Sequence, residues 1–240
     1  MAGQTIQIKA HDGVALDCYV ATPPGNDKVP LIIQSCGAFG MNKDMIDISD
    51  WWAAKGFLVA MPEQWQRGDK GPIKMDEAGR KRAMARITTP GVFEAVKKDL
   101  DATLKHMRQH PRYNGKSALM GYCFAGPFAI AAIVELGCDA AGAYHSGNMD
   151  HQLENLKKST KPLQIHWGDK DFALTPGHLD AVRAAAANNK NAEIFIYPGV
   201  EHGYTGPEAP AWNEKARDLS FERTLAMFEK LKVPPTARAA

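Results

Sequence analysis

From residue 29 onward, short apolar runs that suit buried strands alternate with amphipathic helical patterns. The expected strands are residues 31–35, 57–62, 117–120, 140–145, 163–167 and 193–197, and the expected helices are residues 46–55, 92–107, 124–136, 176–188 and 211–231. Before them, residues 5–9 and 14–21 flank the turn tripeptide His11-Asp12-Gly13 and predict a β-hairpin. Alternating strands and helices predict a three-layer α/β fold, with a mostly parallel sheet covered by helices on both faces.

The chain of 240 residues is long enough for one domain with a large core, and its 45% apolar and 23% charged residues are typical of a globular protein. No internal repeat or linker divides it, so a single domain is expected over residues 1–240. Residues 233–240 are small and rich in proline and alanine, and they are expected to fray.

The net charge of +2, from 29 Lys and Arg against 27 Asp and Glu, gives no electrostatic reason to expect nucleic acid or a membrane as partner. No apolar window is long enough to span a bilayer, and residues 1–10 show no basic stretch followed by an apolar one, so a secretory signal is not expected. The four cysteines match no zinc or CxxC spacing and are expected to be thiols in a reducing cytosol; they are Cys18, Cys36, Cys123 and Cys138. We therefore expect a cytoplasmic protein that acts as a monomer.

The segment Gly121-Tyr122-Cys123-Phe124-Ala125-Gly126 joins an expected strand to an expected helix. Small residues around a central nucleophilic side chain are what a tight strand-to-helix turn needs, although the usual pattern is G-x-Ser-x-G. The helix N-terminus beneath Cys123 would stabilise a thiolate. The alternative is a buried structural cysteine, since free cysteine is among the most buried residue types.

Two later loops supply the partners that a nucleophile needs. Gly168-Asp169-Lys170-Asp171 follows one expected strand and offers carboxylates, and Glu201-His202-Gly203 follows the next and offers a histidine. The chain order of nucleophile, acid and base is that of the α/β-hydrolases. Because the carboxyl ends of parallel strands lie at one edge of a sheet, we expect a catalytic triad there.

These three segments resemble the dienelactone hydrolase (carboxymethylenebutenolidase) family, and the resemblance covers roughly residues 5–232. Supporting segments are Ala38-Phe39-Gly40-Met41-Asn42 and Asn114-Gly115-Lys116. The resemblance implies that Cys123 is the nucleophile, His202 the base and Asp171 the acid, with Asp169 as the competitor for the acid role. It also implies an ester or lactone substrate, with substrate contacts from Arg82 and Phe39.

The residue types then define a mechanism. The Cys123 thiolate attacks an ester or lactone carbonyl and forms an acyl-thioester, and His202, oriented by Asp171, later activates water. The expected oxyanion donors are the backbone N–H groups of Phe124, just after the nucleophile, and of Ala38, in the loop after residues 31–35.

The sequence departs from the family pattern at two positions. The family's glutamate near the resting thiol falls at Gly37, and one of the family's two carboxylate-binding arginines falls at Gly206. Arg82 matches the other arginine, with a solvated basic face as its alternative. These departures favour a directly formed ion pair between Cys123 and His202, and a different acid geometry or a neutral ester as substrate.

No cofactor or metal is expected. The chain contains no GxGxxG, Walker or HExxH motif, and His106 and His110 lack a third ligand at a suitable spacing. Three function classes stay open: a cysteine hydrolase of esters, lactones or thioesters, which we favour; an acyltransferase; and a catalytically weak, redox-regulated protein. In the last class Cys123 would pair with Cys36, whose alternative role is structural packing.

Overall fold

Within residues 3–232, which the structure describes, the computed structural model contains one sheet of eight strands in the order β1-β2-β4-β3-β5-β6-β7-β8. The expected tail at residues 233–240 lies outside the described part. β1 and β2 form the predicted hairpin, β2 also pairs antiparallel with β4, and the remaining neighbours are parallel. The strands are β1 (Gln4–Lys9), β2 (Ala15–Ala21), β3 (Val29–Ser35), β4 (Leu58–Pro62), β5 (Tyr113–Tyr122), β6 (Ala140–Tyr144), β7 (Leu163–Gly168) and β8 (Ala192–Tyr197).

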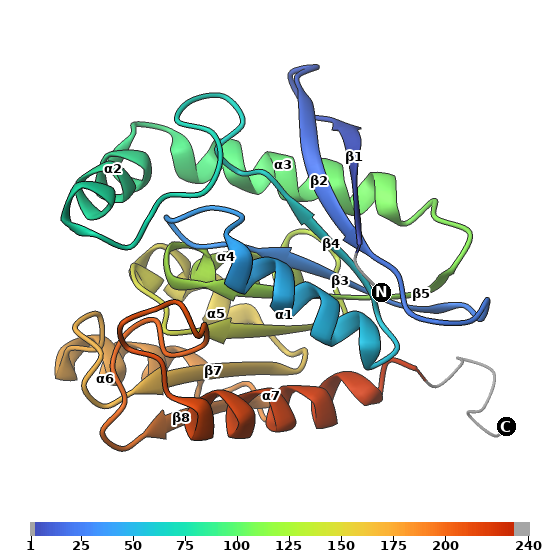
Figure 1. Cartoon of the computed structure of the whole chain (residues 1–240). Helices are drawn as coiled ribbons and strands as arrows, with labels where there is room; N and C mark the ends of the chain where they lie inside the picture. The colour runs from blue at the N-terminus through green and yellow to red at the C-terminus, as the bar shows by residue number, and fades with distance from the viewer. Residues whose placement is uncertain (1–2, 233–240) are drawn as a thin grey trace, which may run out of the picture.

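Helices cover both faces of the sheet (Figure 1), so the predicted three-layer α/β fold is confirmed. One apolar cluster joins the sheet to α3–α6, and a second, rich in aromatic rings, joins the opposite face to α1 and α7. The helices are α1 (Lys43–Ala54), α2 (Glu77–Thr88), α3 (Val92–Met107), α4 (Gly126–Val134), α5 (Leu153–Lys158), α6 (Pro176–Ala186) and α7 (Glu214–Glu229), with short 3₁₀ turns η1 (Cys123–Ala125) and η2 (Met149–Gln152). None of these helices is long and apolar enough to cross a membrane.

The apolar pattern gave no sign of α2 or α5. The buried face of α2 consists of Gly79, Ala83 and Arg86, which are spaced as one side of a helix but include no large apolar side chain. Asp76 nevertheless caps its N-terminus by accepting a hydrogen bond from the N–H of Gly79 at 2.7 Å. The helix packs through Ala83 against two residues: Ala38, in the loop that follows β3, and Ile73, in the segment that precedes α2.

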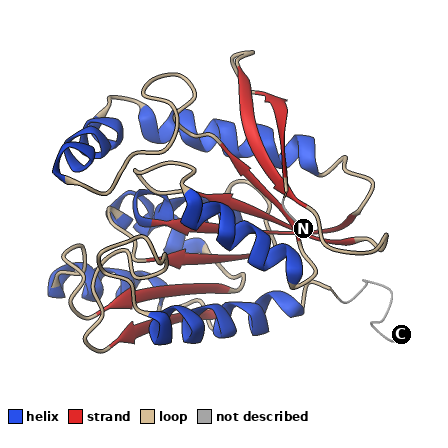
Figure 2. Cartoon of the chain, in the orientation of Figure 1, coloured by secondary structure: helices blue, strands red, loops and turns tan. Residues whose placement is uncertain are grey.

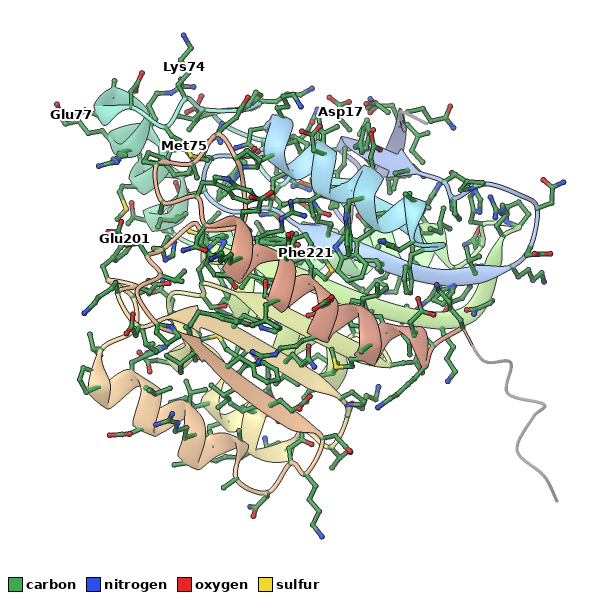
Figure 3. The ribbon with its side chains drawn as sticks, turned by 60° about the horizontal axis from the view of Figure 1, so that its bottom comes forward. Asp17, Lys74, Met75, Glu77, Glu201 and Phe221 are labelled. Atoms are coloured by element: carbon green, nitrogen blue, oxygen red, sulfur yellow. The ribbon has the colours of Figure 1, made fainter. Side chains whose placement is uncertain are left out.

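The loops that follow the parallel strands gather at one end of the sheet, on the left in Figure 2. Figure 3 shows Lys74, Met75 and Glu77, beside the start of α2, and Glu201, in the loop after β8, at this same end. All the residues that the sequence suggested for catalysis lie in these loops. The topology therefore assembles the candidate site from segments far apart in the chain.

Candidate active site

Cys123 lies on a strained turn between β5 and α4. Its φ angle of 56° is in the left-handed region, which non-glycine residues rarely adopt. Gly121 packs so closely on the turn that a Cβ there would lie 2.1 Å from the carbonyl oxygen of Ala125, and a Cβ on Gly126 would lie 1.8 Å from Ser146 Oγ. Gly126, which stands one position later than the second glycine of the G-x-Ser-x-G pattern, thus leaves room for Ser146, which follows β6. The turn is the sharp strand-to-helix bend that presents a nucleophile above a sheet.

His202 and Asp171 come together above the ends of β7 and β8. Nδ1 of His202 lies 2.9 Å from Oδ1 of Asp171, whose side chain is fully buried. The other ring nitrogen, Nε2, is buried and has no oxygen or nitrogen partner among the described residues, so it is free to interact with the Cys123 sulfur. The structure therefore brings the three predicted triad residues to one place.

Asp169, the alternative acid, has a different partner. Its Oδ1 accepts a hydrogen bond from the N–H of Gly199 at 2.7 Å, in the turn that leads to His202. Gly168 packs against the same loop, since a Cβ there would lie 1.9 Å from the carbonyl oxygen of Val200. Asp169 thus shapes the loop that carries the histidine, whereas Asp171 contacts the imidazole itself.

Charges and hydrogen bonds around Cys123 and His202 shift both pKa values in the direction of a thiolate and an imidazolium. Burial opposes ionisation of Cys123, but the charge of His202, its hydrogen bond and the backbone N–H groups of Phe124 and Ala38 together lower the pKa of the thiol. Burial also opposes a charged His202, but the negative charge of Cys123 and the hydrogen bond to Asp171 raise the pKa of the imidazole. Both shifts are in the direction that the ion pair expected from the sequence requires.

Alkylation of Cys123 by iodoacetamide is expected to reach half of its limiting rate below pH 8.5, roughly the pKa of an ordinary cysteine. The lowered pKa keeps the thiolate populated as the pH falls. His202→Gln should move this midpoint upward, because burial then acts without the imidazolium charge. Alkylation rates measured across pH, with peptide mapping, test this. A wild-type midpoint at or above the ordinary value would contradict the ion pair.

The loop after β3 closely approaches Cys123 at Gly37. A Cβ at this position would lie 3.0 Å from Cys123 Cβ and 3.7 Å from its sulfur. The next residue, Ala38, directs its N–H toward the same sulfur, as Phe124 does from the start of α4. The two N–H groups expected to form an oxyanion hole thus converge on Cys123, and at Gly37, where the family carries a glutamate, there is no side chain beside the sulfur.

The two predicted substrate contacts lie beside this loop. Phe39 is half-buried and packs with Ile73 and Ala83. Arg82 is 53% exposed and binds Asp69 through two hydrogen bonds, at 2.5 and 3.0 Å. A substrate carboxylate would therefore compete with Asp69 for this guanidinium.

A carboxylate occupies the space beside Gly206, the position of the missing arginine. A Cβ on Gly206 would lie 2.2 Å from Oδ2 of Asp44, which is 2% exposed and accepts the N–H of Glu208 at 3.1 Å. Burial raises the pKa of Asp44. No larger side chain fits at position 206 while Asp44 keeps this place.

Cys36 is a free, fully buried thiol that packs in the cluster beneath α1 and α7, whereas Cys123 packs against the cluster on the opposite face of the sheet. Burial raises the pKa of Cys36, so it is a poor nucleophile. This placement favours the packing role over the redox pairing.

Several neighbours of the site carried no clear sequence signal. Phe172 is 80% exposed, and the centroid of its ring lies 4.5 Å from that of His202. His145 is buried, with its ring centroid 4.9 Å from that of His202. Arg86 is buried one turn beyond Arg82 and donates to the carbonyl oxygen of Ala38 at 3.0 Å. A loop residue such as Phe172 shows no periodicity that would reveal its contacts.

The chain is similar to known proteins in sequence and in fold. The family model described as the dienelactone hydrolase family matches residues 16–232. This chain belongs to the dienelactone hydrolase family. It is a hydrolase with an α/β-hydrolase fold.

Two carboxymethylenebutenolidases are similar to the chain over nearly their whole length. Carboxymethylenebutenolidase 1 of Cupriavidus pinatubonensis is 22% identical over 235 residues (98% of this chain, 100% of the relative), and the carboxymethylenebutenolidase of Pseudomonas putida is 24% identical over 233 residues (97% and 98%). Among solved structures, a dienelactone hydrolase-like promiscuous phosphotriesterase from metagenomic libraries matches with a TM-score of 0.77 at 16% identity (97% of this chain, 100% of the other).

Proposed function

We propose that this enzyme hydrolyses carboxylic esters or lactones through a covalent thioester on Cys123. The observation that carries the proposal is the placement of His202, bonded through Nδ1 to Asp171 and with Nε2 free beside the thiol. Catalysis by a cysteine needs a thiolate, a proton donor for the leaving group and donors for the oxyanion. In the proposed site Cys123 supplies the thiolate, His202 the proton, and the N–H groups of Ala38 and Phe124 the oxyanion donors.

In the first half of the reaction, the Cys123 thiolate adds to the substrate carbonyl, and the C=O electron pair moves to oxygen. The N–H groups of Ala38 and Phe124 bind this oxyanion. When it collapses, the C–O bond to the leaving group breaks, and protonated His202 gives its proton to the departing alkoxide. The products are a thioester on Cys123 and an alcohol, which stays attached when the substrate is a lactone.

In the second half, neutral His202 takes a proton from water as the water oxygen attacks the thioester. The C–S bond then breaks, and the carboxylic acid leaves. Cys123 returns as the thiolate and His202 as the imidazolium, so the ion pair is restored. Asp171 holds the imidazole in the orientation that both halves require.

The surroundings of the site favour an uncharged substrate with an apolar group. Arg82 is held by Asp69, and Asp44 lies where a second arginine would be needed. Phe172 presents an exposed aromatic ring beside His202. An aryl or alkyl group of the substrate that packs on this ring would be removed from water, which is favourable by about 25 cal/mol per Å² of apolar surface.

Uncharged aryl esters are expected to have a higher kcat/KM than the same esters with a carboxylate on the acyl chain. Phe172→Ala should raise KM for the uncharged esters, and Arg82→Ala should act about equally on both kinds. Steady-state kinetics on matched ester pairs test this. If Arg82→Ala raised KM only for the charged ester, Arg82 would leave Asp69 to bind the carboxylate, as expected from the sequence.

A screen of aryl esters, lactones and thioesters, with Cys123→Ala as the blank, tests the proposed function. Hydrolysis that disappears in this variant supports the proposal, and hydrolysis that persists overturns it. Added amine or alcohol acceptors distinguish acyl transfer, because transfer would divert product from the acid to an amide or a new ester. Absence of turnover on all three substrate classes would favour a catalytically weak protein.

A further inference from the structure

Three side chains bind the loop of residues 36–38 after β3, here called the oxyanion loop, on the side that faces away from Cys123. They donate hydrogen bonds to three consecutive backbone carbonyls: Gln64 Nε2 to Cys36 at 2.9 Å, Trp65 Nε1 to Gly37 at 3.3 Å, and Arg86 Nη1 to Ala38 at 3.0 Å. The donors come from the segment after β4 and from α2. Side chains from two other parts of the chain thus satisfy this short stretch of backbone.

The middle bond, together with the hydrogen bond that the N–H of Gly40 donates to the same Gly37 carbonyl at 3.1 Å, determines where the N–H of Ala38 points. The carbonyl of Gly37 and the N–H of Ala38 belong to one planar trans peptide unit, so the two groups point in opposite directions. When Trp65 holds the carbonyl on the outer side, the N–H must face the opposite side, toward the Cys123 sulfur. Gln64 and Arg86 hold the peptide units before and after it, which restrains rotation of the middle unit.

The three donors are themselves firmly held. Gln64 and Trp65 are each 5% exposed, and the amide oxygen of Gln64 accepts the hydroxyl of Ser35, which leaves the NH₂ group directed at the loop. The ring of Trp65 packs on Phe124, the residue that supplies the other oxyanion donor, with 5.6 Å between ring centroids. Trp65 therefore contacts both segments that supply the oxyanion donors: it binds the Gly37 carbonyl, which precedes the N–H of Ala38, and it packs on the ring of Phe124.

Arg86 directs its guanidinium at backbone carbonyls rather than at solvent. Its side chain is 3% exposed, and besides Ala38 it donates to the carbonyls of Asp69 and Gly71, the latter at 2.6 Å. Its guanidinium carbon lies 5.3 Å from the Trp65 ring centroid. Burying a guanidinium is costly unless its N–H groups are satisfied. The carbonyls bind both terminal nitrogens and keep Arg86 in place, while Nε is buried without a hydrogen-bond partner among the described residues.

We propose that Trp65, Arg86 and Gln64 are positioning residues that aim the Ala38 N–H at the oxyanion of the transition state. The inference rests on the proposed function, since it assigns a task in thioester formation. The hydrogen bonds that the three side chains donate to this loop and its neighbours go to backbone carbonyls rather than to Cys123 or His202. Their effect on the reaction passes through the direction of one backbone N–H.

The test compares Trp65→Phe and Arg86→Met with Arg112→Met. Trp65→Phe removes one N–H and keeps an aromatic ring. Arg112 is a matched control, because its guanidinium also holds three carbonyls, those of Pro23, Pro24 and Asp27, in the distant β2–β3 loop. Thermal unfolding checks that each variant folds.

Three readouts separate positioning of the donor from general disorder of the site. The first is kcat for an aryl ester. The second is the inhibition constant of a trifluoromethyl ketone, to which the Cys123 thiolate adds to form a C–S bond and an oxyanion. The third is the limiting rate of alkylation by iodoacetamide, in which the thiolate displaces iodide and no oxyanion forms.

Loss of one oxyanion donor lowers kcat by about 10²–10³-fold, so its misalignment in Trp65→Phe or Arg86→Met should lower kcat by about 10- to 100-fold. The trifluoromethyl ketone should bind more weakly by a similar factor, while the limiting alkylation rate stays that of the wild type. Arg112→Met should change none of the three. Because Trp65→Phe is nearly isosteric, it carries the test if Arg86→Met does not fold.

The inference is overturned if kcat and ketone binding in Trp65→Phe match those of Arg112→Met. It is also overturned if the limiting alkylation rate falls in step with kcat, since the substitution would then have disturbed the nucleophile itself. Failure of the proposed function would look different: Cys123→Ala would retain ester hydrolysis in the same assay.

Discussion

Replacing Cys123 with alanine is expected to lower kcat/KM for ester hydrolysis by at least about 10⁴-fold. The substitution removes the only atom that forms the covalent intermediate in the proposed mechanism. The variant keeps the Ala38 and Phe124 N–H groups, so substrate binding and electrostatic stabilisation are all that remain. Steady-state assays against the uncatalysed rate give the measurement.

Cys36→Ala is the matched control for this substitution. It removes a second thiol from the adjoining loop, but one that is buried in the cluster beneath α1 and α7. Cys36→Ala should retain most of the wild-type activity, apart from a loss of stability caused by the small cavity. Wild-type rates in Cys123→Ala would refute the nucleophile assignment.

Asp171→Asn is expected to lower kcat by about 10²–10⁴-fold, the second largest effect that we predict. Asp171 accepts the Nδ1 proton of His202 and also the N–H of Ala173 at 2.8 Å. An asparagine in its place supplies no negative charge to stabilise the imidazolium. Because the hydrogen bond to Asp171 helps to raise the pKa of His202, the variant should also lose activity at a lower pH as that group deprotonates.

Asp169→Asn distinguishes the two carboxylates of this loop. Asn keeps an oxygen that can accept the N–H of Gly199, so kcat should fall by less than about tenfold. Parallel pH–rate profiles of the two variants make the comparison. A larger loss in Asp169→Asn than in Asp171→Asn would transfer the acid role to Asp169.

That Cys123, Asp171 and His202 lie at one end of the sheet could be predicted from sequence, because their positions follow from topology. Each comes directly after an apolar run that forms a parallel strand, and such strands end at one edge of the sheet. The choice between Asp169 and Asp171 came from the family resemblance, since both carboxylates follow β7 two residues apart. Their different partners, Gly199 and His202, depend on how two loops pack together.

The role of α2 could not be predicted from its residue pattern. Arg82 and Arg86 are one helical turn apart in α2. Which of them is buried depends on how the helix is rotated about its axis relative to the loop after β3, and this rotation buries Arg86 and leaves Arg82 half-exposed. The buried face consists of small residues and one arginine, which gives no apolar stripe. Likewise, nothing in the sequence indicates which carbonyl the Trp65 indole would bind.

The most direct test of the central claim is to observe the acyl-enzyme. An activated aryl ester with a slowly hydrolysed acyl group is mixed with the enzyme, the reaction is quenched in acid within the burst of phenol release, and the protein is analysed by intact mass and peptide mapping. The mechanism predicts a mass increase equal to one acyl group, located on Cys123 and absent in Cys123→Ala. An acyl group on another side chain, such as the neighbouring Ser146, or a burst without any acyl-enzyme, would contradict it.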